Sequence, residues 1–439
     1  MGGSRFAGWL QGYRSALSHR DLRLMFSAMV VSQVGDWAYN VALLAFVFDR
    51  THSLGWVGAA GLVRFLPVLI LSAYAGVIAE RTERIRLMLG ADVLCTLWMA
   101  ALSLTAAAAG PVVLALVFVA LTSATNTVYN PAVAATIPSL VGEDDLVAAN
   151  ALNGTIENLV VIVGPGIGAV LLLLGSPTTV FVIDAATFAL SALIVLRISA
   201  RSRPVDVTEE GSAGPLRQIT VGVRAIASSH AARTLVAFSA LVSFVYGTDT
   251  VLYVGASAHK LGTGTHGFGY LLAGLGVGGI LTAPAVDRLA GARRLAPIIL
   301  AGTLGYCLPT ALLTVIHSPV LAFFVQVIRG GATLVVDVLA VTALQRAVPG
   351  EQLARVFGVF FAFILGAISL GTLLTPIVVS ATSLDTGFVV MAVAPSLLGL
   401  LGFPALLAID RATAAGAAAL APKVAVLERL EIFASASRS

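Results

Sequence analysis

Long, uninterrupted runs of apolar residues constrain the fold of this chain more than any other feature. Such runs follow one another along all 439 residues, and a helix needs about 20 apolar residues to cross a bilayer. Charged residues make up only 11% of the chain, against about 25% in an average soluble domain. Backbone polar groups in lipid must be paired internally, and unbroken runs are not the alternating pattern of a membrane β-barrel. The sequence therefore predicts an all-α integral membrane protein.

The runs predict twelve transmembrane helices. The first run follows a basic stretch, but it is longer than the 7–15 apolar residues or so of a signal peptide and it contains Asp36, so we keep it as a membrane helix. The expected helices cover residues 22–48, 55–79, 87–109, 112–136, 149–174, 178–197, 233–255, 267–289, 295–316, 319–345, 354–380 and 387–409.

Lysine and arginine gather on one side of this predicted membrane protein. With the N-terminus placed inside, 22 of the 26 basic residues fall in inner segments, whereas the outer side holds only Arg50 and Lys260. The other two, Arg64 and Arg329, lie within helices. Inner loops carry the excess of basic residues in membrane proteins. We therefore expect a multi-pass plasma-membrane protein with both termini in the cytoplasm, and the net charge of +4 needs no nucleic-acid partner.

One polar segment, residues 198–232, divides the chain into an N-terminal half (1–197) and a C-terminal half (233–410), which a tail (411–439) follows. Residues 215–229 could form a short amphipathic helix on the membrane surface. Polar landmarks recur between the halves at an offset of 207 residues, and this predicts two six-helix pseudo-repeats. The matching landmarks are Glu80-Arg81 with Asp287-Arg288, Asn130 with Asp337, and Asp145-Leu146 with Gln352-Leu353.

Two short motifs resemble signatures of the major facilitator superfamily. Residues 76–84 resemble its loop 2–3 signature, Gly-x-x-Ala-Asp-Arg-x-Gly-Arg, with Glu80 and Glu83 at the two positions that differ. Residues 164–168 resemble the Gly-Pro-x-x-Gly core of its antiporter signature. The resemblance implies the major facilitator fold, with substrate bound near the midplane between the two halves. It implies gating roles for Gly76, Glu80, Arg81, Arg84, Gly164, Pro165 and Gly168.

Each motif also has a physical reading. A carboxylate at Glu80 can face the positive N-terminus of a neighbouring helix, and by resemblance that helix begins near residues 349–355. The alternative is an ordinary basic inner loop. Pro165 removes a helix hydrogen bond, and the glycines beside it let another helix approach closely. We therefore expect a pivot in the fifth helix.

A wider resemblance covers most of the chain. It is carried by residues 32–36, 130–132, 149–151 and 181–185, which read SQVGD, NPA, ANA and FVIDA. These segments are similar to the drug:proton antiporter branch that includes macrolide efflux and enterobactin export proteins. The resemblance implies a multidrug-type efflux antiporter that uses protons and a small-molecule substrate.

Polar residues inside the membrane are the candidate site, because a charge at the bilayer centre costs at least about 2.5–3.5 kcal/mol. They form stripes on single helix faces, and by resemblance the first, fourth, seventh and tenth helices line the cavity. The expected cavity residues are Gln33, Asn40, Arg64, Asn126, Asn130, Asp249, Arg329 and Asp337. The alternative for Arg64 and Arg329 is that each pairs with a carboxylate to fix helix packing. Asp92 and Asp184 are placed near helix ends, in interfacial or packing roles.

Asp36 and Glu157, in that order, are the carboxylates expected to couple transport to protons. Asp36 lies deep in the first helix, with no charged residue three or four positions away. The midplane holds four carboxylates against two arginines, so at least one carboxylate could lack a full partner. A carboxyl group in apolar surroundings binds a proton more readily than one in water.

We therefore expect a proton-coupled secondary transporter, acting as a monomer, that exports amphipathic small molecules such as drugs or siderophores. A lipid flippase or an importer on the same fold stays open. A membrane-embedded enzyme would need a nucleophile, a histidine pair or a metal cluster, and no such pattern is present. Cys95 and Cys307 lie in apolar runs and form no metal motif. No Walker motif is present, and we expect no cofactor and no metal.

Overall fold

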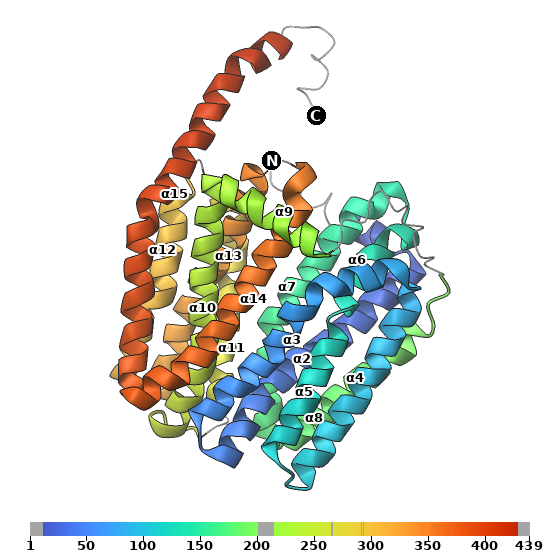
Figure 1. The fold of residues 1–439 in the computed structure, drawn as a ribbon, viewed down its shortest axis with the longest axis vertical. Coiled ribbons are helices and arrows are strands. Elements are labelled where there is room, and N and C mark those ends of the chain that lie inside the picture. Colours follow the sequence, from blue (N-terminus) through green and yellow to red (C-terminus); the bar gives the residue numbers. More distant parts are fainter. Residues whose placement is uncertain are drawn as a thin grey trace.

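A computed structural model of the chain describes residues 12–200, 215–264, 267–290, 292, 294–348 and 350–428. Throughout that part of the chain the regular elements are helices (Figure 1). Eleven of them are long and apolar enough to cross a membrane. The prediction of an all-α membrane protein is confirmed.

The N-terminal half contains α2 (Arg20–Thr51), α3 (Leu54–Arg81), α4 (Arg84–Ala107), α5 (Val112–Asn126), α6 (Tyr129–Leu140), α7 (Glu143–Leu174) and α8 (Pro177–Val195). Helix α9 (Pro215–Ser228) connects the halves. The C-terminal half contains α10 (His230–His259), α11 (Gly267–Ala290), α12 (Ala296–Cys307), the 3₁₀ helix η2 (Leu308–Thr314), α13 (Pro319–Ala347), α14 (Gly350–Ala381) and α15 (Leu384–Glu428).

Helix α7 is the expected crossing that falls outside those eleven spans. It begins with Glu143, Asp144 and Asp145, and Asn153 and Glu157 follow in its first half. Only its second half, Val163–Leu174, forms a short apolar stretch.

Two expected helices are interrupted, and proline explains both interruptions. The fourth expected helix divides into α5 and α6 at Thr127 and Val128, because Pro131 has no N–H to donate to the Thr127 carbonyl. The ninth expected helix changes from α12 to η2 at Leu308, where Pro309 has the same effect. The last helix was expected to end at residue 409, but α15 continues to Glu428.

The two halves are related by matching helix contacts. Between the halves, α3 packs against α14 and α7 packs against α11. At the 207-residue offset α3 corresponds to α11 and α7 corresponds to α14. The two contacts are therefore the same contact made once from each half. Within the halves, Gly164 of α7 lies against Trp37 of α2, while Gly371 of α14, 207 positions further on, lies against Phe244 of α10. The 207-residue repeat in the sequence is therefore also a repeat in the packing.

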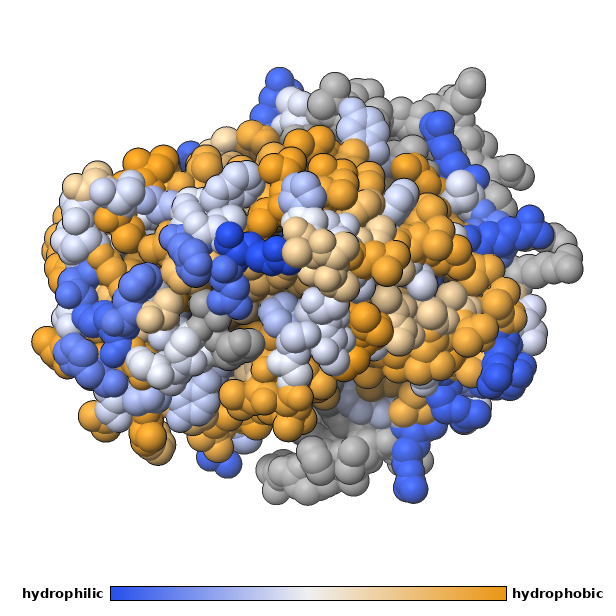
Figure 2. Space-filling view, turned by 90° about the horizontal axis from the view of Figure 1, so that it is seen from below, coloured by the Kyte–Doolittle hydropathy of each residue, from blue (hydrophilic) through white to orange (hydrophobic). Residues whose placement is uncertain are grey.

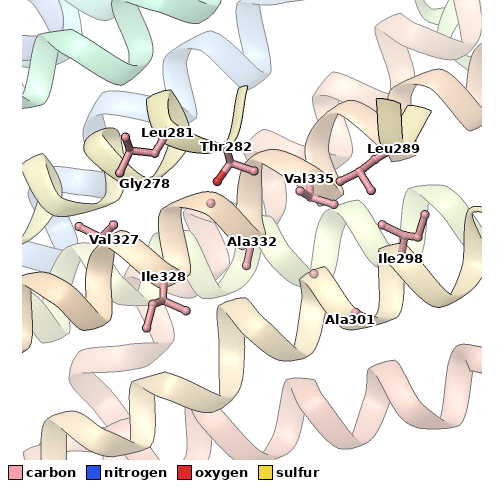
Figure 3. Close-up of a pocket in the computed structure, with 12 residues that line it drawn as sticks. Gly278, Leu281, Thr282, Leu289, Ile298, Ala301, Val327, Ile328, Ala332 and Val335 are labelled. Carbon is pink, nitrogen blue, oxygen red and sulfur yellow. The ribbon is translucent and has the colours of Figure 1, made fainter. Parts of the chain in front are cut away.

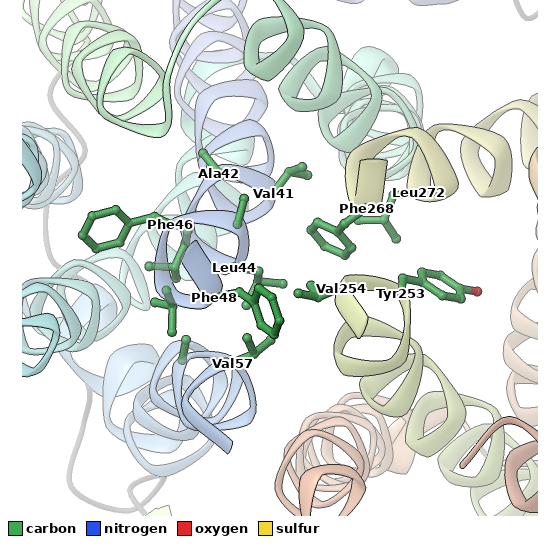
Figure 4. Packing of buried hydrophobic residues seen from close by; sticks show 14 of the residues in the cluster. Val41, Ala42, Leu44, Phe46, Phe48, Val57, Tyr253, Val254, Phe268 and Leu272 are labelled. Atoms are coloured by element: carbon green, nitrogen blue, oxygen red, sulfur yellow. The ribbon is translucent and has the colours of Figure 1, made fainter. Parts of the chain in front are cut away.

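Among the described residues, the buried apolar cluster that joins the two halves lies at one end of the molecule. We call the end at which α2 and α10 begin the basic face, because Arg20, Arg23, Arg197, Arg233 and Arg294 lie there, and the other end the opposite face. Near the opposite face, one buried cluster contains residues of both halves, including Phe46 and Phe48 of α2 and Val254 and Phe268 of α10 and α11 (Figure 4). Near the basic face, each half has its own cluster.

The burial pattern of α2 and α10 agrees with this arrangement. Residues 38–48 of α2 and 247–257 of α10 are buried on every side, whereas the first halves of both helices alternate between buried and partly exposed positions. Any passage between the halves is therefore closed at the opposite face in this conformation. Seen from that face, hydrophilic side chains form patches within a largely apolar surface (Figure 2).

Helix α9 lies across the basic face and packs against α14, α10 and α3, so it touches both halves (Figure 1). The expectation of a helix within residues 215–229 is thereby confirmed.

Candidate functional site

The N-terminal half holds an ion pair between α2 and α3. Arg64 donates from Nη2 to Asp36 Oδ2 at 2.8 Å and to the Asp36 carbonyl at 3.2 Å. The guanidinium lies over the ring of Tyr39, 4.8 Å from its centroid. The Asp36 side chain keeps 18% of its exposure and Arg64 keeps 7%. The sequence shows no charged residue three or four positions from Asp36 along α2, and the charged partner that the structure gives it comes from α3.

A second polar contact continues this site toward the basic face. Gln33, one turn before Asp36, donates to Asn130 Oδ1 of α6 at 3.0 Å. Asn130 is exposed, while Asn126 at the end of α5 is partly exposed and Asn40 is buried. We call Gln33, Asp36, Arg64 and Asn130 the N-half cluster. It connects α2 with both α3 and α6.

The C-terminal half encloses a different network. Arg329 of α13 donates from Nη2 to Asp249 Oδ2 of α10 at 2.7 Å and from Nε to the Tyr306 carbonyl at 2.7 Å. Its Nη1 donates to Gln326 at 3.0 Å and also to the Tyr253 hydroxyl. The Tyr306 hydroxyl donates to Asp249 Oδ2 at 2.7 Å.

We call Asp249, Tyr253, Tyr306, Gln326 and Arg329 the C-half network. Arg329 is 0% exposed and Asp249 is 1% exposed, so neither can contact a substrate in this conformation. The packing alternative raised for Arg329 is the one that this geometry favours. The sequence analysis missed Tyr253 and Tyr306, although Tyr253 lies one turn after Asp249 on α10.

Two of the candidate carboxylates have no cationic partner among the residues that the structure describes. Glu157 of α7 is partly buried and accepts a hydrogen bond from Asn153 Nδ2 at 3.2 Å. Asp337 of α13 is exposed and makes no polar contact with another described residue. The structure thus separates the four candidates into two that are paired with arginine, Asp36 and Asp249, and two that are not.

Asp92 and Asp184 do not lie near helix ends, and this expectation is wrong. Both are within α4 and α8 and are only 1% and 0% exposed. Ser191 donates to Asp92 Oδ2 at 2.6 Å, and Thr187 donates to Asp184 Oδ1 at 3.1 Å. Gly35 leaves the space for this contact, because a Cβ there would come within 2.3 Å of Asp184 Oδ1. The expected helices 87–109 and 178–197 end within three residues of α4 and α8, but the contacts of α8 with α4 and α2 that bury both carboxylates cannot be read from one helix.

The glycines of residues 164–168 bring α7 against the α2 segment that follows Asp36. A Cβ on Gly164 would lie 2.4 Å from the Trp37 Cβ, and one on Gly168 would lie 2.5 Å from the Ala38 carbonyl oxygen. Pro165 is buried within α7. The close helix approach expected for this motif is therefore present, while its role in gating stays a prediction.

The loop 2–3 motif is described only in part. Arg84 is buried and donates to the Ala79 and Ala135 carbonyls at 3.4 and 3.0 Å, and so connects the end of α3 with α6. Arg81 is exposed, and a Cβ on Gly76 would meet nothing within 4 Å. The Glu80 side chain lies outside the described residues. The helix expected to face it begins at Gly350, as α14, but the side chains of residues 350–355 also lie outside the described part.

Within the described part of the chain, no group of three metal-ligating side chains occurs. Cys95 and Cys307 are buried and free. Among the described residues, neither thiol is hydrogen-bonded to a member of the two polar clusters.

Solved structures share this fold. A mutant of the nucleoside transporter NupG superposes with a TM-score of 0.72 at 13% identity, covering 88% of this chain and 99% of that one. A mutant of the peptide transporter POT gives a TM-score of 0.70 at 13% identity, covering 89% and 95%. The helices and their two-fold repeat define a multi-pass membrane protein with the major facilitator fold.

The sequence comparisons narrow this class to a family. The model of the family described as transmembrane secretion effector matches residues 12–428, so the chain belongs to that family. Enterobactin exporters EntS of Shigella boydii serotype 18 and Escherichia coli O81 are each 26% identical over 396 residues, which cover 88% of this chain and 93% of theirs. These findings confirm the expected resemblance to the major facilitator superfamily and to enterobactin export proteins.

Proposed function

We propose that this transporter is a proton-coupled exporter of amphipathic small molecules, of the drug or siderophore type, and that coupling takes place at two carboxylates of the N-terminal half, Asp36 of the N-half cluster and Glu157 of α7. The observation that carries the proposal is the contrast in accessibility between the two halves. In the N-half cluster Gln33 and Asp36 are partly exposed and Asn130 is exposed, whereas the charged pair of the C-half network is enclosed.

The conformation supports this assignment. The halves are joined near the opposite face by one apolar cluster that begins just after Asp36 on α2, at Tyr39. Asp36 and Gln33 therefore lie on the side of that closure that faces the basic face. A substrate entering from there would meet Gln33, Asp36 and Asn130 before the apolar closure.

Asp36 and Glu157, the two accessible carboxylates of this half, can have different roles in proton coupling. Glu157 has no countercharge among the described residues, and so it can take up a proton without breaking an ion pair. Proton binding at Asp36 would instead release Arg64. We therefore reverse the order expected from the sequence and assign the carried proton first to Glu157. Asp36 and Arg64 then form a pair whose opening accompanies movement of α2 against α3.

The export direction is supported by the relatives, which are named as exporters of enterobactin. Few charged groups and many apolar side chains near the N-half cluster suit an amphipathic substrate better than a sugar or a nucleotide. By the same resemblance we propose that the protein is an antiporter, which exchanges substrate for protons, and that it accepts several drug-like substrates.

The orientation that export requires has both termini and residues 198–232 in the cytoplasm, as the excess of basic residues predicts. A reporter fused after Arg203 tests it. We expect alkaline phosphatase to be inactive there and a green fluorescent protein to be fluorescent. Phosphatase activity at that position would place the basic face outside and reverse the proposed direction.

Transport is tested in inside-out membrane vesicles energised with a proton gradient. Uptake of a panel of dyes, macrolides and catecholate siderophores is measured over pH 6–8. We expect gradient-dependent accumulation of at least one amphipathic compound. Accumulation in right-side-out vesicles alone would indicate an importer, and movement of a fluorescent phospholipid alone would indicate a flippase.

Glu157→Gln tests the coupling residue in the same assay. We expect it to abolish uphill accumulation and its pH dependence while downhill exchange of substrate continues, because the substitution removes the group that titrates and keeps its shape. Glu143→Gln is the matched control, since Glu143 is an exposed acid in the first turn of the same helix. Unchanged pH-dependent accumulation in Glu157→Gln would exclude this role for Glu157.

A further inference from the structure

An apolar groove runs along the outer surface of the C-terminal half, between α11, α12 and α13, and it is separate from the polar clusters. Its volume is about 480 Å³. Figure 3 shows Gly278, Leu281 and Thr282 of α11 on one side, Val327, Ile328 and Ala332 of α13 beneath, and Ile298 and Ala301 of α12 on the other side. Thr282 contributes the one side-chain polar group of its lining.

Glycines explain why a groove forms here. A Cβ on Gly278 would lie 1.9 Å from the Val327 carbonyl oxygen, and one on Gly330 would lie 1.9 Å from the Leu275 carbonyl oxygen. Helices α11 and α13 therefore touch through their backbones, and little side-chain volume is left at the contact. On the facing side of α12 the lining residues Ala301 and Gly302 are also small, so their side chains do not fill the space between the helices.

The other half lacks this combination of small residues. At positions 207 residues earlier, Leu71 replaces Gly278, Leu94 replaces Ala301 and Cys95 replaces Gly302. The groove is therefore a feature of the C-terminal half and not of the repeated fold.

The surroundings of the groove indicate its occupant. Its rim residues Leu281 and Ile328 are 68% and 61% exposed and belong to membrane-crossing helices, so they face lipid. The lining extends from Gly278 to Leu289 along α11, about 16 Å at 1.5 Å per residue. That length is about half of a bilayer core of about 30 Å, and so it matches one leaflet.

Two exposed arginines lie at the basic-face end of the groove. Arg288 precedes the lining residue Leu289 in the last turn of α11, and Arg294 lies four residues before Ile298, just ahead of α12. Basic residues at the membrane surface beside a pocket between helices attract anionic lipid headgroups. We propose that this groove binds an anionic glycerophospholipid, with an acyl chain between α11, α12 and α13 and the phosphate at Arg288 and Arg294.

Lipid retention tests the proposal without any transport measurement. The purified protein is reconstituted in nanodiscs with equal amounts of phosphatidylglycerol and phosphatidylcholine, extracted into mild detergent, and examined by native mass spectrometry. We expect the wild-type protein to retain one phosphatidylglycerol at least tenfold more often than one phosphatidylcholine.

Two variants separate the headgroup from the chain. The double variant Arg288→Gln/Arg294→Gln should reduce phosphatidylglycerol to the level of phosphatidylcholine. Ala301→Phe should fill the groove and remove both lipids, and because Ala301 is exposed the substitution crowds no buried contact. Arg197→Gln and Ala186→Phe are matched controls, since both positions are exposed on α8 or its end, away from the groove.

Equal retention of the two lipids by the wild-type protein would overturn the proposal. So would wild-type retention in Ala301→Phe, because the lipid would then be held at the surface by charge alone. Losses in the control variants as large as those in the groove variants would show that retention reflects the general surface of the protein.

Discussion

The two halves each bury an arginine beside an aspartate, but the two pairs are built differently. The pair of Asp36 and Arg64 joins α2 to α3 and keeps 18% and 7% of its side-chain exposure. The pair of Asp249 and Arg329 joins α10 to α13 and keeps 1% and 0%. Tyr253, Tyr306 and Gln326 surround the second pair with hydrogen bonds. Each pair nevertheless leaves a buried atom without a hydrogen-bond partner, Arg64 Nε in the first and Asp249 Oδ1 in the second.

The pairs are not copies made by the repeat. The position that corresponds to Asp36 is Ser243, and the position that corresponds to Arg329 is Thr122. The backbone packing of the two halves is shared, as Gly164 and Gly371 show, while the charges are not. The repeated fold supplies two similar bundles, and each bundle places its charged pair at a different position: one pair stays partly exposed, and the other is enclosed.

The largest expected effect follows from breaking the enclosed pair. Arg329→Gln leaves Asp249 as a buried charge without its partner, and such a change costs about 3–5 kcal/mol. Arg64→Gln should cost less, about 1–3 kcal/mol, because Asp36 is partly exposed. Thermal unfolding of the two purified variants in detergent measures both effects. Equal destabilisation by the two substitutions would remove the distinction between the halves.

The next prediction concerns transport rather than stability. Asp36→Asn keeps the size of the side chain and removes the charge that holds Arg64. We expect folded protein at a near wild-type level, with uphill transport reduced at least tenfold, because opening and closing of the pair no longer depends on charge. Vesicle transport at equal expression is the measurement. A fully active Asp36→Asn variant would make the N-half pair a packing element like that of the other half.

Much of this fold could be predicted because its causes are local. Apolar runs fix the helices, and the 207-residue repeat fixes the division into halves. The candidate site could be predicted only in part. Spacing placed Gln33 and Asp36 on one face of α2, and their partners Asn130 and Arg64 were both among the candidates. That Arg64 pairs with Asp36 depends on how α2 packs against α3, and periodicity within one helix does not contain that information.

The same reason explains what was missed. Tyr253 and Tyr306 looked like ordinary aromatic residues in apolar helices, and their role appears only where α10, α12 and α13 meet around Arg329. The depths of Asp92 and Asp184 were misjudged although their helices were predicted to within three residues, because their burial comes from the packing of α8 against α4 and α2.

A smaller loss of stability is expected from substitutions at the close helix contacts that both halves share. Gly164→Ala and Gly371→Ala each place a methyl group against a packed helix, at 2.4 Å from the Trp37 Cβ and 2.2 Å from the Phe244 carbonyl oxygen. Overpacking of this kind costs about 1–3 kcal/mol, and we expect similar losses of stability in the two variants. Gly166→Ala is the control, because its nearest contact would be an ordinary 3.9 Å. A loss confined to one half would show that the packing repeat does not extend to its energetics.

The smallest expected effect lies at the basic face of the N-terminal half, where His19 Nε2 and Asp145 Oδ2 are 2.9 Å apart. Hydrogen bonds from His19 and Ser15 lower the pKa of Asp145 below its ordinary value of 3.8. A lowered folded-state pKa adds stability above the unfolded pKa, and this contribution is lost as the pH falls through the folded pKa. The difference in melting temperature between wild type and Asp145→Asn should therefore be constant above about pH 5 and should shrink below the unfolded pKa. The corresponding position in the other half is Gln352, which does not titrate, so Gln352→Ala should give a difference that does not vary with acid pH. A difference for Asp145→Asn that stays constant down to pH 3 would show that the contact with His19 does not favour the ionised carboxylate.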